Sequence, residues 1–148
     1  MKRHLSQLTN VYPSASAFHY TMLFFRVAVS VQLMVAHGLK KIGVGVLQAE
    51  VVPNPLHLPE AFNHAFAIAS NLIFPCFIIL GLFTRLACLG VLVVTLTGYF
   101  LVHWHDSALQ KDAPYMYSAA ALLILFLGAG KYSCDFVLSR TFSKKVWS

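Results

Sequence analysis

Four segments of the chain are predominantly apolar, and each is close to the length that a membrane-crossing helix needs. They cover residues 18–37, 62–83, 86–104 and 115–130. A helix rises about 1.5 Å per residue, so roughly 20 residues cross a hydrocarbon core of about 30 Å. The pattern predicts an all-α fold, a four-transmembrane-helix bundle that forms one integral membrane domain over residues 1–148 with short basic tails.

The connections between these segments differ in length and composition. Only Thr84 and Arg85 separate the second and third segments, which predicts a tight antiparallel hairpin. The connection between the first and second segments is the longest and carries Pro53, Pro55 and Pro59. Because proline restricts the backbone, we expect an ordered outer loop that covers the mouth of the bundle.

Composition agrees with a membrane domain and excludes several other classes of protein. Hydrophobic residues make up 58% of the 148 positions, charged residues make up 11%, and the mean hydropathy is +0.69. In a soluble domain about a quarter of the residues are charged. These values exclude an independent soluble enzyme, a disordered chain and a secreted disulfide-rich scaffold.

The basic residues gather on one side of the predicted bundle. Four spans place both termini and the turn at Arg85 on the same side, with seven basic residues: Lys2, Arg3, Arg85, Lys131, Arg140, Lys144 and Lys145. The opposite side carries Lys40, Lys41 and Lys111. The positive-inside rule therefore predicts cytoplasmic termini. The net charge of +6 does not indicate a nucleic-acid partner, because the basic residues do not form a continuous stripe.

Two polar residues interrupt the predicted spans at similar depth. A charged side chain inside a membrane costs about 2.5 to 3.5 kcal/mol on insertion scales, so Arg26 should face the interior of the bundle. Pro75 removes the helical donor of the Asn71 carbonyl, four residues earlier. We therefore expect Arg26 to hydrogen-bond Asn71. The alternative is that Arg26 reaches the inner headgroups while Asn71 bonds a neighbouring helix.

The spacing of polar residues predicts a cleft. Arg26, Ser30 and His37 share one face of the first helix, and His64 and Asn71, seven residues apart, share one face of the second. If these faces meet, the five residues line a polar ligand-binding cleft that opens outward.

Five of the seven histidines map to the outer ends of the helices or the outer loop. Imidazole is a common ligand of zinc, copper and haem iron, which makes these residues candidate metal ligands. Two other interpretations stay open: contacts with headgroups or a quinone, and an ordinary aromatic belt at the interface. The five are His37, His57, His64, His103 and His105.

Three motifs occur in a fixed order and resemble those of the DoxX family of small four-helix membrane proteins. They are HGLKK at 37–41 after Arg26, ILGLFTR at 79–85 and GAGKYSCD at 128–135. The resemblance implies a multi-pass protein of the bacterial inner (plasma) membrane. Family namesakes include a subunit of a thiosulfate:quinone oxidoreductase, and other members are associated with thiol and oxidative-stress systems. The family motif positions are Gly38, Lys41, Gly81, Arg85, Gly128, Gly130, Ser133 and Asp135.

The resemblance also implies two glutamates that this chain lacks. Asn71 stands at the position of one in the second span, and Met116 is nearest to the other at the start of the fourth. Both losses remove ionisable groups that carry protons or balance Arg26. The chain either keeps the bundle with altered or lost family chemistry, or binds an anionic ligand that supplies the missing charge.

The sequence favours an accessory role over catalysis. No Ser-His-Asp or Cys-His arrangement follows from the spacing, and the spans carry no paired carboxylates. The first hypothesis is a non-catalytic subunit of a quinone- or thiol-linked membrane redox system, with quinone as the candidate cofactor ahead of metal or haem. The second is a membrane adaptor, or a helper in solute or metal export or uptake. The expected contacts are the lipid bilayer, an oxidoreductase or other membrane partner, and further copies of this chain.

Overall fold

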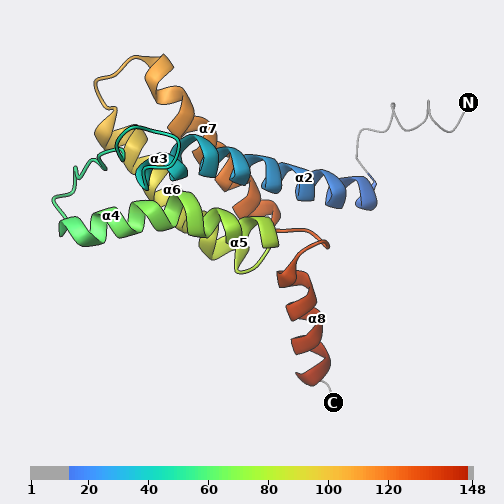
Figure 1. The fold of residues 1–148 in the computed structure, drawn as a ribbon. Helices are drawn as coiled ribbons and strands as arrows, with labels where there is room; N and C mark the ends of the chain where they lie inside the picture. The colour runs from blue at the N-terminus through green and yellow to red at the C-terminus, as the bar shows by residue number, and fades with distance from the viewer. Residues whose placement is uncertain (1–13, 147–148) are drawn as a thin grey trace, which may run out of the picture.

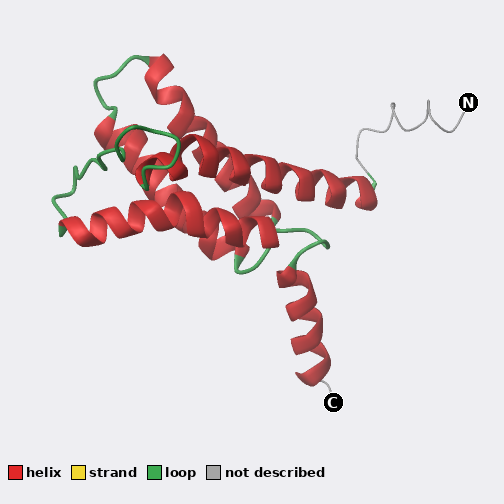
Figure 2. Cartoon of the chain, viewed as in Figure 1, coloured by secondary structure: helices red, strands yellow, loops and turns green. Residues whose placement is uncertain are grey.

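The computed structural model describes residues 14–146, and within that range every regular secondary-structure element is a helix, joined by loops and turns (Figure 1; Figure 2). Each of the first three long helices contains one π-helical turn. They are α2 (Ala15–Leu33), η1 (Met34–Gly38) and α3 (Leu39–Lys41), then α4 (Glu60–Ile68), η2 (Ala69–Ile73) and α5 (Phe74–Leu80), then α6 (Thr84–Thr97) and η3 (Gly98–Val102). α7 (Ala108–Leu127) and α8 (Cys134–Val146) follow. The predicted all-α class is confirmed.

Three helices in the described range are long and apolar enough to cross a membrane. They are Ala15–Lys41, Glu60–Leu80 and Thr84–Val102, with 27, 21 and 19 residues. They contain the first three predicted spans almost completely. α7 has 20 residues but is not one of the three, and its first turns carry Gln110, Lys111 and Asp112. The four-span bundle therefore stays a prediction at this point.

The fourth predicted segment has the wrong boundaries. We expected a helix over 115–130 that starts near Asp112 and Pro114, but α7 begins at Ala108 because Ser107 and Gln110 form a capping box. The Ser107 backbone nitrogen donates to Gln110 Oε1 at 3.3 Å. Pro114 consequently lies inside the helix, and the helix ends at Leu127, before Gly128.

The hairpin between the second and third helices turns three residues earlier than predicted. Gly81 ends α5 with a left-handed φ of 66°, a conformation that glycine adopts without steric cost. Phe83 also has a left-handed φ, of 46°, and α6 begins at Thr84. Thr84 and Arg85, the predicted connection, thus form the first turn of α6.

The core lies where α2, α5, α6 and α7 meet. α6 and α7 pack along much of their length, and α5 lies against both α2 and α6. Gly90 of α6 lets the Phe74 ring approach closely, since a Cβ atom there would overlap the ring. The Ser118 hydroxyl of α7 donates to Thr95 Oγ1 of α6 at 2.8 Å. The buried apolar side chains at this centre are Met22, Leu33, Ile78, Ala87, Cys88, Val91, Leu92, Ala121 and Ile124.

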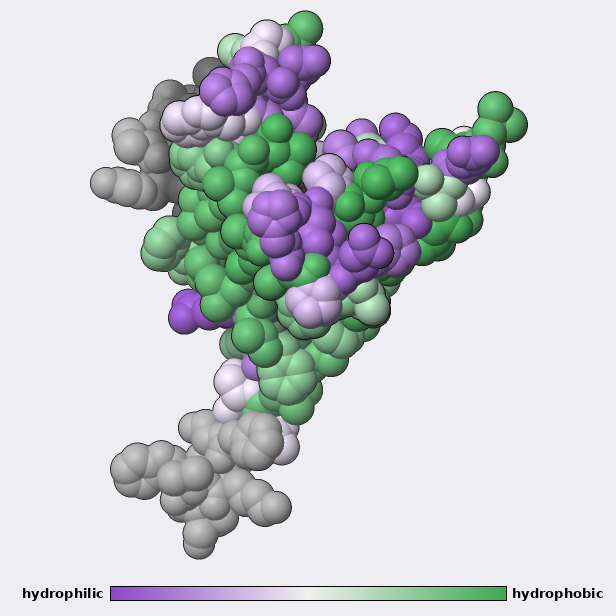
Figure 3. All heavy atoms as spheres, turned by 90° about the vertical axis from the view of Figure 1, so that its left-hand side faces the viewer, coloured by the Kyte–Doolittle hydropathy of each residue, from purple (hydrophilic) through white to green (hydrophobic). Residues whose placement is uncertain are grey.

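The molecule has two distinct ends. The loop end comprises residues 42–59 and the α6–α7 turn at 103–107, and the α8 end comprises the turns at 81–83 and 128–133 (Figure 1). Viewed from the loop end, hydrophilic residues gather over that end and hydrophobic residues cover much of the flanks (Figure 3). Many large apolar side chains on the flanks are exposed, for example Phe24 at 74% and Phe126 at 75%. Such flanks match a lipid environment.

Candidate functional site

A cavity of about 370 Å³ lies between the helices at the loop end. Leu33, Phe66 and Val94 supply apolar walls, and His37, Asn71 and Tyr117 supply polar groups. Small-molecule sites typically have volumes of roughly 300 to 1,000 Å³ and combine apolar walls with a few polar groups. The cavity therefore has the size and lining of a site for one small, largely apolar group.

All three π-helical turns lie beside this cavity. η1 contributes His37, η2 contributes Asn71, and η3 contributes Gly98 and Val102 to its wall. The backbone signature is the same in each: the amide after the turn donates to the carbonyl five residues earlier, as His103 does to Gly98 at 2.9 Å. π-helical turns are rare and occur frequently at functional sites. Three of them around one cavity mark it independently of its residue types.

Gly38 brings the first helix close to the second at the cavity. A Cβ atom on Gly38 would lie 2.5 Å from the Asn71 carbonyl oxygen and 2.5 Å from Leu72 Cδ2. The carbonyl that Pro75 deprives of a helical donor thus faces Gly38. This contact explains the glycine of the HGLKK motif, since any side chain would separate η1 from η2.

Two walls of the cavity present groups that can bind a ligand. The Asn71 amide nitrogen donates to Ala67 O at 2.7 Å, and its amide oxygen has no hydrogen-bond partner among the described residues. The half-buried His37 ring meets the Tyr117 ring edge to face, with centroids 5.4 Å apart and planes at 88°. An amide, an imidazole and a phenol together offer donors and acceptors to a neutral ligand.

The outer loop closes part of the cavity. Asn54 braces the proline-containing segment by donating to Leu58 O at 2.6 Å and accepting from Leu58 N at 3.0 Å. Asn63 of α4 donates to Pro53 O at 3.1 Å. Lys41 Nζ and Glu50 Oε2, both at the cavity wall, lie 3.6 Å apart. These contacts agree with the prediction of an ordered loop over the mouth.

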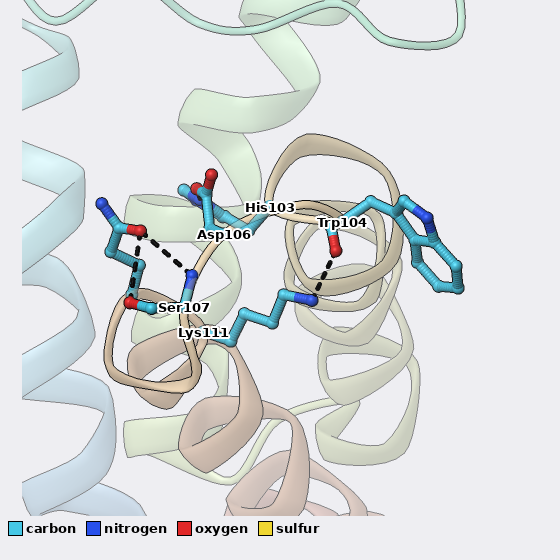
Figure 4. A network of polar contacts seen from close by, with 6 residues as sticks. His103, Trp104, Asp106, Ser107 and Lys111 are labelled. Carbon is cyan, nitrogen blue, oxygen red and sulfur yellow. Dashed lines mark hydrogen bonds and ion pairs between the residues drawn. The ribbon is translucent and has the colours of Figure 1, made fainter.

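The α6–α7 turn forms another part of the rim (Figure 4). His103 lines the cavity, and its Nδ1 lies 2.6 Å from Asp106 Oδ2, so the carboxylate orients the ring. Lys111 Nζ donates to Trp104 O at 2.7 Å. The two contacts hold the turn between the helices. His105, in the same turn, is exposed and does not line the cavity.

The structure divides the predicted cleft residues between different places. His37 and Asn71 line the cavity, whereas His64 is exposed on α4 and lies outside it. Arg26 and Ser30 are buried in α2 but are not part of the wall. The cavity is therefore shorter than the predicted cleft, which included all five polar residues of the first two helices.

The five candidate histidines do not converge. His57 and His64 are exposed and lie outside the cavity wall that includes His37 and His103. Within residues 14–146 no group of three or more histidine, cysteine, aspartate and glutamate side chains is placed to hold a metal ion. The geometry of the described residues thus gives the metal interpretation no support.

The predicted Arg26–Asn71 pair is wrong. The Arg26 side chain is 1% exposed and turns toward the α8 end, where Nη1 donates to Ile78 O at 3.4 Å and Nη2 donates to Tyr132 O. Its Nε has no partner among the described residues. Ile78 belongs to the last turn of α5, where carbonyls carry partial negative charge that attracts a guanidinium. The Asn71 amide nitrogen instead donates within its own helix, to Ala67 O.

Contacts at the α8 end account for three more motif residues. Asp135 accepts from Phe83 N at 2.8 Å and from Thr84 N at 2.9 Å, so its carboxylate caps α6, and its own amide donates to Gly81 O at 2.8 Å. A Cβ atom on Gly81 would overlap Arg26 Nη1 and Ser133. Ser133 Oγ accepts from Phe136 N at 3.2 Å and caps α8. This cluster, Arg26, Gly81, Ser133 and Asp135, is called the α8-end clamp below.

Besides Gly38, four motif residues lie outside the clamp contacts. Gly128 and Gly130 have φ of 78° each and shape the turn between α7 and α8. Arg85 is exposed at the start of α6. Lys41 belongs to the loop end, through its ion pair with Glu50.

Sequence reasoning missed several residues of the cavity. Tyr117, Thr95 and Thr97 come from α6 and α7, whose polar residues we did not align with the first two helices. The hydrogen bond between Ser118 and Thr95 shows that the polar residues of α6 and α7 face each other. Pro75 was a signal for an irregular second helix, but nothing comparable in the sequence marks η1.

A family model described as DoxX matches residues 21–104, which is more than half of the chain. A protein of Haemophilus influenzae described as uncharacterized is 29% identical over 100 residues, which cover 64% of this chain and 66% of the relative. The match thus spans slightly less than two thirds of that relative's length. No solved structure matches the chain.

Proposed function

This chain belongs to the DoxX family of membrane proteins, and on that premise we propose that its loop-end cavity binds the head of a quinone. In this proposal the protein is a non-catalytic, accessory subunit of a quinone- or thiol-linked redox system in a bacterial inner membrane. The observation that carries it is the meeting of His37, Asn71 and Tyr117 at a cavity bordered by three π-helical turns.

The proposed topology has four spans, with α7 as the fourth and both termini in the cytoplasm. α7 packs along α6, and this contact supports α7 as the fourth span. A helix whose first turns are polar inserts into a membrane more easily when a neighbouring helix covers part of its surface. The exposed basic residues Arg85, Lys131 and Arg140 lie at the α8 end. Four of the five acidic residues, Glu50, Glu60, Asp106 and Asp112, lie at the loop end or in its first adjoining helical turns. Lys144 and Lys145 in the sequence of α8 raise the basic residues of that end above the three at the loop end, Lys40, Lys41 and Lys111, and this excess of lysine and arginine favours a cytoplasmic α8 end.

The chemistry of the cavity suits a quinone. A quinone ring is flat and apolar, and its two carbonyl oxygens accept hydrogen bonds. The His37 imidazole and the Tyr117 hydroxyl can donate to such oxygens, while Leu33, Phe66 and Val94 contact the ring. The described ion pair between Lys41 and Glu50 balances its own charge, so the wall favours a neutral ligand over an anion.

The accessory role is supported by the absence of the family's two glutamates from this chain. At the family's two glutamate positions stand Asn71 and Met116, and neither exchanges protons at ordinary pH. In the proposal an oxidoreductase partner carries the electrons, and this chain holds and orients the quinone. Asn71 then contributes an uncharged acceptor where a carboxylate would add charge.

The test is to purify the protein gently in nanodiscs and to quantify retained quinone by mass spectrometry and absorbance. His37→Ala should lower retention about tenfold, the scale of one lost hydrogen bond plus ring contact. His64→Ala is the matched control, because His64 is exposed outside the cavity. Equal retention by both variants, or no quinone in the parent protein, would remove the proposal and favour the adaptor or solute-helper role.

A further inference from the structure

α8 runs in a different direction from the three helices that are long and apolar enough to cross a membrane. It leaves the bundle at the α8 end and runs across the direction of α2, α5 and α6 (Figure 1). If those helices stand across a bilayer, a helix in this orientation lies along the bilayer surface. Its first residue, Cys134, follows directly on the turn that ends the bundle.

The start of α8 is fixed to the ends of the membrane-capable helices. Arg26 of α2 holds the Tyr132 carbonyl, and the Asp135 carboxylate binds the Phe83 and Thr84 amides at the start of α6. These bonds set the level of α8 at the place where the second apolar helix ends and the third begins. That level is the expected position of a membrane surface.

Exposed charge at the α8 end is predominantly positive. Arg85, Lys131 and Arg140 are exposed, and the sequence adds Lys144 and Lys145 within α8. The acidic residue here is Asp135, whose two oxygens are both occupied by backbone amides. Among the described residues no carboxylate pairs with Arg85, Lys131 or Arg140. A surface of this kind attracts anions.

α8 also exposes apolar side chains beside its cations. Val137 is 62% exposed and Leu138 is 38% exposed. The Arg140 guanidinium lies 5.7 Å from the centroid of the Phe136 ring, so the cation and an aromatic face occupy one patch. Apolar and basic groups together on a short helix are typical of segments that lie in the headgroup region of a membrane.

We propose that α8 lies on the membrane surface and binds the headgroups of anionic phospholipids through Arg140 and the basic residues that follow it. The α8-end clamp acts as the positioning device that keeps the helix at headgroup level. The inference goes beyond quinone binding and uses the proposed function only to assign the surface to the cytoplasmic leaflet. Lipid headgroups are favoured over an acidic protein because exposed apolar residues accompany the cations at the level where the spans end.

The experiment uses the full chain in nanodiscs of phosphatidylcholine alone or mixed with phosphatidylglycerol. In a Trp104→Phe variant Trp147, just beyond α8, is the remaining tryptophan, and shallow brominated lipids quench it if it lies at the interface. We expect stronger quenching in the anionic discs. Each basic residue near a surface contributes about a fivefold gain in affinity for anionic lipid. Arg140→Gln, Lys144→Gln and Lys145→Gln combined should therefore abolish the preference.

Lys40→Gln is the control, because Lys40 is exposed at the loop end. Quenching that is absent, or equal in neutral and anionic discs, would overturn the proposal, as would loss of the anionic preference on addition of an acidic soluble protein bound by α8. The two leaflets of a disc are equivalent, so a reversed topology would leave the result unchanged. Quinone retention should be normal in the triple variant, which separates this inference from the proposed function.

Discussion

Arg26 holds the backbone carbonyl of Tyr132, a residue 106 positions later in the chain. The bond joins the first membrane-capable helix to the turn before α8, and Gly81 leaves the room for it. A buried guanidinium in this protein thus fastens one end of the bundle, while the candidate ligand site occupies the other end.

Arg26→Ala should destabilise the protein without emptying the cavity. The variant loses two hydrogen bonds from a charged donor and leaves a void, together about 2 to 4 kcal/mol. Thermal unfolding in detergent should show the loss, while quinone retained per folded molecule stays the same. Ser30→Ala, one turn further along α2, is the control and should be mild. If Arg26→Ala lowered the quinone retained per folded molecule, Arg26 would belong to the ligand site and our assignment would be wrong.

Gly38→Ala should weaken both the fold and ligand retention. Its Cβ would press on the Asn71 carbonyl, which belongs to the backbone and cannot turn aside, so we expect a cost of about 1 to 3 kcal/mol. Gly98→Ala is matched, because its Cβ would meet only Pro114 Cβ at 3.8 Å. Thermal unfolding of the two variants makes the comparison. Equal stability would mean that η1 and η2 do not approach as closely as described.

Asp135→Asn should loosen the start of α6. The amide has one acceptor oxygen where the carboxylate has two, so either Phe83 N or Thr84 N loses its partner, at a cost of about 0.5 to 2 kcal/mol. Hydrogen exchange at these two amides should become faster. Asp112 is exposed on α7, so the control variant Asp112→Asn should leave hydrogen exchange at the Phe83 and Thr84 amides unchanged. Unaltered exchange in Asp135→Asn would refute the capping role.

Filling the cavity should displace the ligand without unfolding the chain. Thr97 is partly exposed and lines the cavity wall, so Thr97→Leu adds volume there. Thr97→Val keeps the shape and serves as the control. We expect quinone retention to fall about tenfold or more in the leucine variant only, with little change in unfolding temperature. Normal retention in Thr97→Leu would show that the ligand lies elsewhere.

Much of the fold was predictable because apolar length and local capping signals are carried by consecutive residues. The first three helices, the tight hairpin and the all-α class follow from such signals. The fourth helix was misplaced because Asp112 and Pro114 resemble a start, while the stronger Ser107–Gln110 capping box lies earlier. The family resemblance singled out the motif residues, but it did not predict the contacts that these residues make.

The contacts of the site depend on details that side-chain spacing does not contain. Ideal helical spacing placed Arg26, Ser30 and His37 on one stripe, yet η1 changes the rotation of the helix just before His37. An arginine side chain reaches either way along its helix, and the carbonyls of Ile78, in the last turn of α5, and of Tyr132, before α8, decided its direction. His37 and Asn71 both line the cavity, because Gly38, next to His37, packs against the Asn71 carbonyl in the middle of the second helix.

The most direct test of the ligand site is photolabelling of the full-length protein in nanodiscs with an azido-quinone, followed by peptide mapping. The account predicts that the label attaches within 33–41, 66–71 or 114–117, the stretches that carry His37, Asn71 and Tyr117, and that excess unlabelled quinone prevents it. Label that concentrates around Arg26 at the α8 end, or that spreads over the lipid-facing flanks regardless of competitor, would contradict it.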